Sequence, residues 1–352
     1  MRILTVILVL AIGLAGCDRT VPSLSDFDRS IPTDSVGTVK YLELVPPISG
    51  FNAPQGLLFG YDQLLYVADT RNNRIVQMDL SGQILSTRTL AMPYAISQDK
   101  RLDILASGLV VSGQDSIGAL FRYRLVEANH DISLAPVETL WTEVAHPKRR
   151  FTGIAALPDN EFLVARQGPD NSSFVDPDGR LLRFAANNAF ITPIVDLVTQ
   201  TGTGIRDINQ PTGIGLFSNS KSFIILQNST GMAYGAIWMV YISTSDFVGW
   251  QPKFDPAQQE QRSIDFIRPN RFVLPQGVAV DGRRGDIFIA DAALDSVFKF
   301  DSKGAFKAES FGLSKSGGHM QHPTAVAFFN KTLYVLDAAT NQILLFKLST
   351  DF

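Results

Sequence analysis

Short apolar runs alternate with turn-rich segments along most of the chain. Between residues 53 and 82, the runs GLLF, LLYVAD and RIVQMDL are separated by GYDQ and TRNNR. Runs of four to eight residues rich in β-branched and aromatic side chains, bounded by Gly, Asn and Asp, predict strands. The same pattern returns at residues 274–304 and 322–348. A recurring unit that cannot bury both of its faces alone predicts a repeat-built β structure.

Six such units can be aligned on their first strand, with uneven spacing because insertions fall in loops. The fourth unit is expected to end with residues 263–267, SIDFI. The sixth stops after three strands, and residues 38–45, TVKYLELV, stand outside every unit. This segment can supply the missing strand and close the ring, which leaves only short, protected edges. The predicted fold class is therefore all-β, a six-bladed β-propeller of four-stranded blades whose last blade is closed by the N-terminal strand.

The pattern x-P-x-G-[IVL]-x-[VF], followed by [LI]-[YF]-[VI]-A-D and N/D-x-[RV]-[IV], resembles the NHL repeat. The match is close in the first and fifth units, good in the sixth, where Ala325 replaces Gly, looser in the third and fourth, and weak in the second. The resemblance covers residues 38–349 and implies a six-bladed propeller. Similar propellers include peptidyl-hydroxyglycine lyases, streptogramin lyases, gluconolactonases, quinoprotein sugar dehydrogenases and non-catalytic interaction modules. The architecture therefore does not decide the function.

The chain begins with MRILTVILVLAIGLAGC, in which Arg2 precedes an apolar run over residues 3–16. A spanning helix needs about 20 apolar residues, so this shorter run is more typical of a signal peptide. Residues 14–17, LAGC, resemble the lipobox of bacterial lipoproteins, which implies cleavage before Cys17 and its lipidation. Cys17 is the single cysteine, and lipidation explains an odd cysteine in an exported protein. The alternative is an ordinary secretory signal with a chance cysteine.

Three parts follow from these features. Residues 1–16 are expected to be a lipoprotein signal peptide, 17–37 a lipidated cysteine with a flexible tether, and 38–352 the propeller. Several acyl chains would hold the protein stably at the membrane. The expected location is thus the bacterial cell envelope, on the periplasmic face. Asp18 resembles an inner-membrane retention signal, which favours the inner membrane.

The bulk composition agrees with a globular protein. Hydrophobic residues make up 45% and charged residues 18% of the chain, which suits a packed core and not a disordered chain. The formal net charge of −3 gives no electrostatic footprint for nucleic acid, so no nucleic-acid partner is expected. We expect a monomer.

Candidate ligand-binding residues come from two positions of the repeat. The start of a blade's first strand and the end of its second strand lie on the same face of a propeller, around the mouth of the central channel. The first position is neutral and polar in every unit, so it can form hydrogen bonds but cannot hold a hard cation. Arg166 and Gln227 at the second position complete the predicted set. The candidates are Gln55, Tyr94, Thr152, Arg166, Thr212, Gln227, Gln276 and Thr324.

Metal sites have little support in the sequence. Calcium prefers six to eight oxygen ligands, and three aspartates at the ends of second strands could contribute to such a site. These aspartates recur as part of the repeat, however, which favours a structural role in capping the turn that follows. Of the four histidines, including His130 and His146, only one pair lies close in sequence, and a catalytic zinc needs three converging ligands. No metal is predicted. The weak candidates are Asp69, Asp291, Asp337, His319 and His322.

Other catalytic signatures are equally sparse. The sequence contains no G-x-S-x-G elbow, phosphate-binding loop or dinucleotide fingerprint. Residues 151–170 resemble propeller strands of the quinoprotein dehydrogenases, which would make His146 a base and place Arg166 near the cofactor. A basic cluster at residues 148–150, with Arg166, Arg206 and Arg71, could form an anion-binding rim, or else a solvated loop.

The favoured interpretation is a membrane-anchored, exported propeller that binds a protein, peptide or glycan through its loop-bearing face, without catalysis and without a cofactor. Insertions at 126–149, 192–209 and 243–273 carry side chains of the types enriched in interface hot spots. These are Trp141, Trp250, Phe254, Arg268 and Arg271. The alternative is a lyase, lactonase or quinoprotein-type dehydrogenase acting on a small substrate at the central channel, with a calcium ion or a quinone cofactor.

Overall fold

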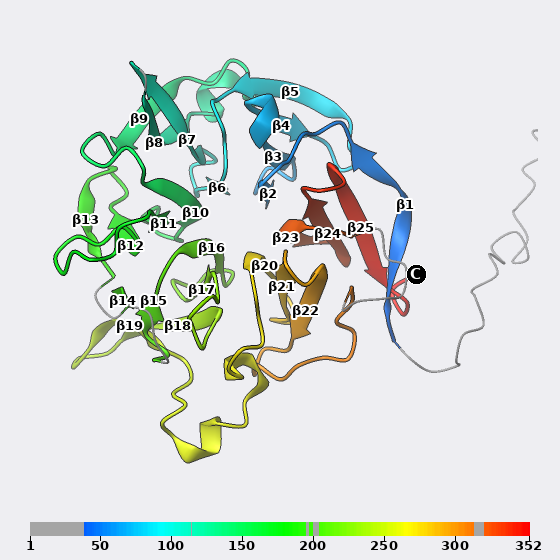
Figure 1. Cartoon of the computed structure of the whole chain (residues 1–352). Helices are drawn as coiled ribbons and strands as arrows, with labels where there is room; N and C mark the ends of the chain where they lie inside the picture. Colours follow the sequence, from blue (N-terminus) through cyan, green and yellow to red (C-terminus); the bar gives the residue numbers. More distant parts are fainter. Residues whose placement is uncertain (1–38, 114, 195–196, 200–203, 313–319) are drawn as a thin grey trace, which may run out of the picture. The chain divides into compact units, whose positions relative to one another are not determined.

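The computed structural model describes residues 39–113, 115–194, 197–199, 204–312 and 320–352. Residues 39–352 form one compact unit. Six of its sheets are arranged as blades around a common axis, and one edge strand of each blade lies innermost (Figure 1). The signal peptide, Cys17 and the tether predicted from the sequence, as well as His319, lie outside the described residues. No helix in the described part is long and apolar enough to cross a membrane.

The first three blades are antiparallel sheets of four consecutive strands. Their bounds are β2 Gly56–Phe59, β3 Leu65–Asp69, β4 Arg74–Met78 and β5 Ile84–Thr89 in blade 1; β6 Ile96–Gln98, β7 Ile104–Ser112, β8 Asp115–Tyr123 and β9 Val137–Thr142 in blade 2; and β10 Arg150–Ala156, β11 Phe162–Gln167, β12 Arg180–Phe184 and β13 Phe190–Pro193 in blade 3.

The last three blades complete the described ring. Their bounds are β16 Pro211–Leu216, β17 Phe223–Gln227, β18 Ala236–Ser243 and β19 Val248–Pro252 in blade 4; β20 Pro275–Val280, β21 Ile287–Asp291 and β22 Ser296–Phe300 in blade 5; and β23 Pro323–Phe329, β24 Thr332–Asp337, β25 Gln342–Leu348 and β1 Tyr41–Ser49 in blade 6. The pairing of β1 with β25 confirms the predicted closure by the N-terminal strand.

Two details of the strand prediction were wrong. Residues 263–267 do not form the last strand of blade 4; that strand is β19, and the segment contains the 3₁₀ turn η5, Asp265–Ile267. Blade 5 has three strands in the described part of the chain, and its outer edge is closed by isolated bridges from Phe306 and Phe311. The apolar residues of 263–267 suggested a strand, but Phe266 and Ile267 are buried between blades 4 and 5.

Short elements occupy the longer connections. The 3₁₀ turns η2 Thr70–Asn72, η3 Val126–Ala128 and η4 Gln259–Gln261 lie between strands, and β14 Val198–Thr199 pairs with β15 Asp207–Ile208 in the only parallel sheet of the described residues. All three predicted insertions supply core residues, and the insertion at 192–209 contributes Ile208 to the core between blades 3 and 4. Ile132 packs between blades 1 and 2, and Phe254 between blades 4 and 5.

The core lies between the blades, because second strands bury both of their faces. In β3, Leu65 and Val67 pack against blade 6, whereas Tyr66 and Ala68 pack against blade 2. Side chains of successive strand residues point to opposite faces, so a strand between two neighbours reads as a continuous apolar run. This explains the recurring LYVAD-like segment.

Glycine in the first strand lets neighbouring blades approach closely. A Cβ atom added to Gly213 would lie 2.3 Å from the carbonyl oxygen of Gln276 in blade 5, and one added to Gly277 would lie 2.5 Å from Cα of Ala325 in blade 6. Such distances are far below van der Waals contact, and the obstructing atoms belong to the backbone. The Gly of the x-P-x-G pattern is therefore required by the seam between blades.

The substitution Gly213→Ala should lower the free energy of unfolding by about 1–3 kcal/mol, because overpacking here forces two first strands apart. Urea unfolding followed by circular dichroism checks this. Ala325→Gly is the matched control, since the sixth blade accommodates a methyl group at this position. This substitution should lower the free energy of unfolding by about 1 kcal/mol, because it removes a buried methyl group and raises the entropy of the unfolded chain. An unchanged midpoint for Gly213→Ala would contradict the steric explanation.

Candidate functional site: the channel mouth

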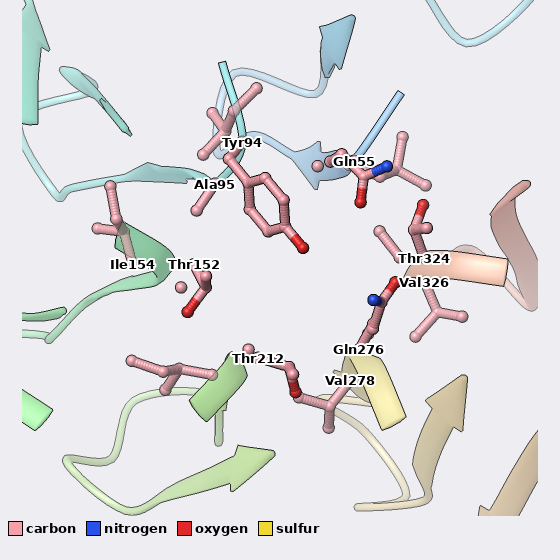
Figure 2. A pocket seen from close by; sticks show the side chains of 18 residues that line it. Gln55, Tyr94, Ala95, Thr152, Ile154, Thr212, Gln276, Val278, Thr324 and Val326 are labelled. Atoms are coloured by element: carbon pink, nitrogen blue, oxygen red, sulfur yellow. The ribbon is translucent and has the colours of Figure 1, made fainter. Parts of the chain in front are cut away.

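The six residues at the starts of the first strands line one pocket at the channel mouth. Figure 2 shows their side chains around a common opening, and the pocket has a volume of about 80 Å³. In blades 3 to 6 the residue sits at an irregularity in the pairing of the first two strands, for example between Pro211 and Gly213. Such bulges redirect a side chain, here toward the axis. We call these residues the mouth ring: Gln55, Tyr94, Thr152, Thr212, Gln276 and Thr324.

The three threonines of the mouth ring join neighbouring blades. Each hydroxyl donates a hydrogen bond to the carbonyl oxygen of the proline that begins the next blade: Thr152 to Pro211 at 2.6 Å, Thr212 to Pro275, and Thr324 to Pro54 at 3.1 Å. All three threonines are buried. Their first role is thus to hold the ring together.

The seams that follow blades 1 and 2 obtain the same bond from Thr70, which directly follows the second strand β3, and from Ser107 in the second strand β7. Thr70 donates to the carbonyl of Pro93 at 2.8 Å, and Ser107 donates to the carbonyl of Phe151 at 2.9 Å. Tyr94 and Gln55 are consequently not needed for these bonds. The mouth ring is divided between short residues that connect blades and long residues that extend into the opening.

Three long polar side chains remain for a ligand. Gln55, Tyr94 and Gln276 are half-buried, and Figure 2 shows the Tyr94 hydroxyl pointing into the opening from one side and the two carboxamides from the other. The Oε1 atom of Gln276 is buried without a hydrogen-bond partner, a state that costs free energy until a donor arrives. Burial raises the pKa of Tyr94, so its phenol stays neutral. The mouth therefore offers uncharged donors and acceptors.

An aliphatic layer lies directly beneath the mouth ring. Its six residues come from the same first strands, and they line both the mouth pocket and a second pocket of about 260 Å³ that opens on the other side. A polar ring on an apolar floor suits a small ligand with a polar edge and an apolar face. These floor residues are Leu57, Ile96, Ile154, Ile214, Val278 and Val326.

The second-strand aspartates have internal partners. Asp291 accepts hydrogen bonds from the backbone N–H groups of four residues, at positions 273, 274, 293 and 294. Asp337 accepts four in the same manner, and Asp69 accepts from a backbone N–H, Asn72 and Arg74. All three are fully buried. These contacts are those of turn caps, and the carboxylates do not line the mouth pocket.

The donor set therefore does not fit a calcium ion at the mouth. The lining residues supply no carboxylate, and the nearest aspartates have their oxygens bonded to backbone N–H groups. Within the described residues, no group of three or more His, Cys, Asp or Glu side chains is placed to hold a metal ion. His322 follows the same capping pattern, with its backbone N–H donating to Asp337 at 3.3 Å.

Gln227 and Arg166 lie outside the mouth pocket and are buried. Gln227 accepts a hydrogen bond from the N–H of Asn209 and donates to the carbonyls of Asp207 and Tyr234. It thereby replaces the capping aspartate in blade 4. Arg166 donates to Glu143, Asp176 and two backbone carbonyls.

Two members of the predicted basic rim, Arg149 and Arg166, are neutralised inside the protein. Arg149 is 3% exposed and pairs with Glu143, Asp176 and Asp178. Arg150 donates to backbone carbonyls, and burial lowers its pKa. Arg149 and Arg166 thus belong to a buried ion-pair network, whereas the side chains at positions 71, 148 and 206 are exposed. The same contacts occupy the guanidinium of Arg166, the residue that the resemblance to quinoprotein dehydrogenases would place near a cofactor.

Two of the five predicted interface residues are also buried. Trp250 and Phe254 are 4% and 8% exposed and belong to the cores between blades. Arg271 packs over the rings of Phe300 and Phe306, whereas Arg268 is exposed. Trp141 is half-buried beside a cavity, at the seam of blades 2 and 3. The aromatic content of the insertions reflects core packing more than recognition.

Comparison with known proteins supports the fold. No protein-family model matches the chain, and no curated protein matches its sequence. Solved structures with a similar fold include the quinone-bound aldose sugar dehydrogenase of Streptomyces coelicolor, at 14% identity and a TM-score of 0.58, covering 90% of this chain and 100% of that one. A gluconolactonase of Xanthomonas campestris has 12% identity and a TM-score of 0.55, with 90% and 99% covered. An auxiliary nutrient binding protein of Bacteroides thetaiotaomicron has 12% identity and a TM-score of 0.57, with 85% and 70% covered.

These similarities establish a six-bladed propeller fold shared by enzymes and by a binding protein. At such low identity they extend to the fold alone. The NHL repeat and the lipoprotein signal remain sequence-based expectations.

Replacing Thr212 by Val should lower the free energy of unfolding by about 1–3 kcal/mol, because the carbonyl of Pro275 then loses a buried donor. Thr212→Ser keeps the hydroxyl and is the control. Guanidinium unfolding of both variants measures the difference. Equal stability of the Val and Ser variants would show that the hydroxyl does not hold the seam.

Proposed function

We propose that this protein is a non-catalytic binding module of the bacterial cell envelope that holds an uncharged polar group of its ligand at the channel mouth. The observation that supports this most directly is the division of the mouth ring. Gln55, Tyr94 and Gln276 extend uncharged hydrogen-bonding groups over an aliphatic floor, whereas the neighbouring carboxylates cap backbone N–H groups. Such a site can recognise a ligand but offers no charged acid or base at the opening.

The ligand belongs to a protein, peptide or glycan that presents a hydroxyl or amide group. A hydroxyl group and an amide group each offer a donor for the side-chain carbonyl of Gln276 and an acceptor for the Tyr94 hydroxyl. In this proposal, lipidated Cys17 and the tether hold the propeller at the periplasmic face of the membrane. The protein acts as a monomer and needs no cofactor.

Tyr94→Phe should weaken ligand binding about three- to tenfold, the effect of losing one neutral hydrogen bond, with little change in unfolding free energy. Binding is measured on arrays of immobilised glycans and synthetic peptides, followed by calorimetry on the best ligand. Thr212→Val is the matched control from the same ring, and it should lose stability but retain affinity. Equal affinity of wild type and Tyr94→Phe would contradict a site at the mouth.

Binding should be unaffected by EDTA and constant from neutral pH to about pH 10, because burial raises the pKa of Tyr94 above its usual value of 10.0. The folded-state pKa lies above the unfolded one, so the contribution of this phenol to stability is complete below pH 10 and falls as pH rises through the folded pKa. Calorimetric titrations at increasing pH check this. Metal-dependent turnover of a lactone or sugar by the purified protein would instead support the enzymatic alternative.

A further inference from the structure

A second cavity, of about 430 Å³, lies at the seam between blades 2 and 3, apart from the channel mouth. Strands β9, β12 and β13 and the loops at 143–149 and 168–179 form its walls. None of its lining residues belongs to the mouth ring. One part of the lining is apolar and consists of Trp141, Leu182, Phe190 and Pro193. We call it the Trp141 cavity.

The aromatic wall of this cavity is held in place from behind. Trp141 and Phe190 lie 5.6 Å apart and both pack on Phe184, which is fully buried. The indole N–H of Trp141 donates to Glu143 at 3.3 Å, which fixes the edge of the ring. Trp141 is nevertheless half-buried, unlike Trp238 and Trp250. Trp141 is thus a rigid aromatic surface that a ligand can reach.

The polar wall consists of planar groups fixed by ion pairs. Arg149 and Arg166 both bind Glu143 and Asp176, and Arg149 also binds Asp178, at distances of 2.6–3.3 Å. Arginine paired in this way presents a planar, preorganised array of donors. Loop 168–179 is tied at its base by Asp178, which accepts from the N–H of Asp170 at 2.8 Å.

Two groups of this wall retain hydrogen-bonding capacity toward the cavity. The side chain of Asp176 is 46% exposed, and that of Arg180 is 28% exposed. Arg180 donates to the carbonyl of Val175 at 2.8 Å and lies 4.0 Å from Asp176, which leaves most of its five N–H donors available. A carboxylate and a guanidinium side by side can bind two adjacent hydroxyl groups.

The charges of the wall cancel. The carboxylates of Glu143, Asp176 and Asp178 balance the three guanidinium groups at positions 149, 166 and 180. An anionic ligand would add uncompensated charge to a partly buried network, and a cation would do the same. A neutral ligand avoids this cost.

We propose that the Trp141 cavity binds a neutral saccharide unit, independently of the channel mouth. A pyranose ring has an apolar C–H face and a rim of hydroxyl groups. The face fits the surface of Trp141 and Phe190, and adjacent hydroxyls fit the acceptor of Asp176 and the donors of Arg180. A purely apolar ligand would leave the polar wall without partners, and a peptide side chain lacks adjacent hydroxyl groups on a ring.

Intrinsic fluorescence tests this directly, because Trp141 is the least buried of the three tryptophans of the chain. The purified protein is titrated with maltose, cellobiose and chitobiose, and with glucuronate as an anionic probe. We expect at least one neutral disaccharide to change the emission saturably, with a Kd on the order of 1 mM. No saturable change with any of them, or a response to glucuronate alone, overturns the proposal.

Variants then locate the site by calorimetry. Trp141→Ala and Arg180→Gln should each weaken disaccharide binding about tenfold or more. Phe174→Ala is the matched control, since this side chain of loop 168–179 is 99% exposed and does not line the cavity. Tyr94→Phe should leave disaccharide affinity unchanged, even if the mouth has another ligand.

Circular dichroism confirms folding of each variant, and the partly exposed Arg180 provides the test if Trp141→Ala does not fold. Undiminished affinity in Arg180→Gln, or loss of affinity in Tyr94→Phe, assigns the saccharide elsewhere and overturns the proposal.

Discussion

The close approach of neighbouring first strands is the constraint on which the rest of the structure depends. At the seam of blades 4 and 5, a backbone carbonyl of Gln276 lies where a side chain on Gly213 would begin, and the hydroxyl of Thr212 bonds to Pro275 beside it. Without disulfides, these contacts and the apolar layers between blades must fix the ring. A buried hydroxyl–carbonyl bond is individually modest, but its loss leaves an unsatisfied carbonyl in a tightly packed position.

This constraint also selects the residues that can serve a ligand. Where the first strand begins with threonine, the side chain is short and its hydroxyl is bonded to the next blade. Where Thr70, just after β3, and Ser107, in β7, provide that bond, the segment that leads into the first strand is free to carry Gln55 and Tyr94. Two of the three ligand-facing positions at the mouth are therefore available because another residue holds the seam.

The sequence was sufficient to predict the architecture because the fold repeats a local pattern. Alignment of the six units predicted the ring closure by β1, and it selected the six residues that the structure brings around one pocket. It could not reveal that three of them are bound to a neighbouring blade, because Thr212 and Pro275 are 63 positions apart. The prediction of a strand at residues 263–267 and of an interface role for Phe254 failed for another reason. An apolar side chain in an irregular segment gives the same sequence signal whether it lies in a strand, packs into the core or contacts a partner. Strand β19, with a glycine and a proline in five residues, lacked the usual strand composition.

Blade 3 shows how a departure from the repeat creates a site. At the end of the second strand, blades 1, 5 and 6 carry an aspartate that accepts backbone N–H groups. Blade 3 carries Arg166 at this position. A carboxylate needs hydrogen-bond donors around it, whereas a guanidinium needs acceptors. It obtains them from the carbonyls of Pro177 and Asp178 and from two carboxylates, one of them Asp176 in the extended loop 168–179. Loop 168–179 and Glu143 thus supply the acceptors that are needed when an arginine replaces an aspartate at this position of the repeat.

Arg149 pairs with the same carboxylates, and the resulting rigid polar wall faces the cavity beside Trp141. A capping aspartate at position 166 would need no such partners, and no polar wall would be built there.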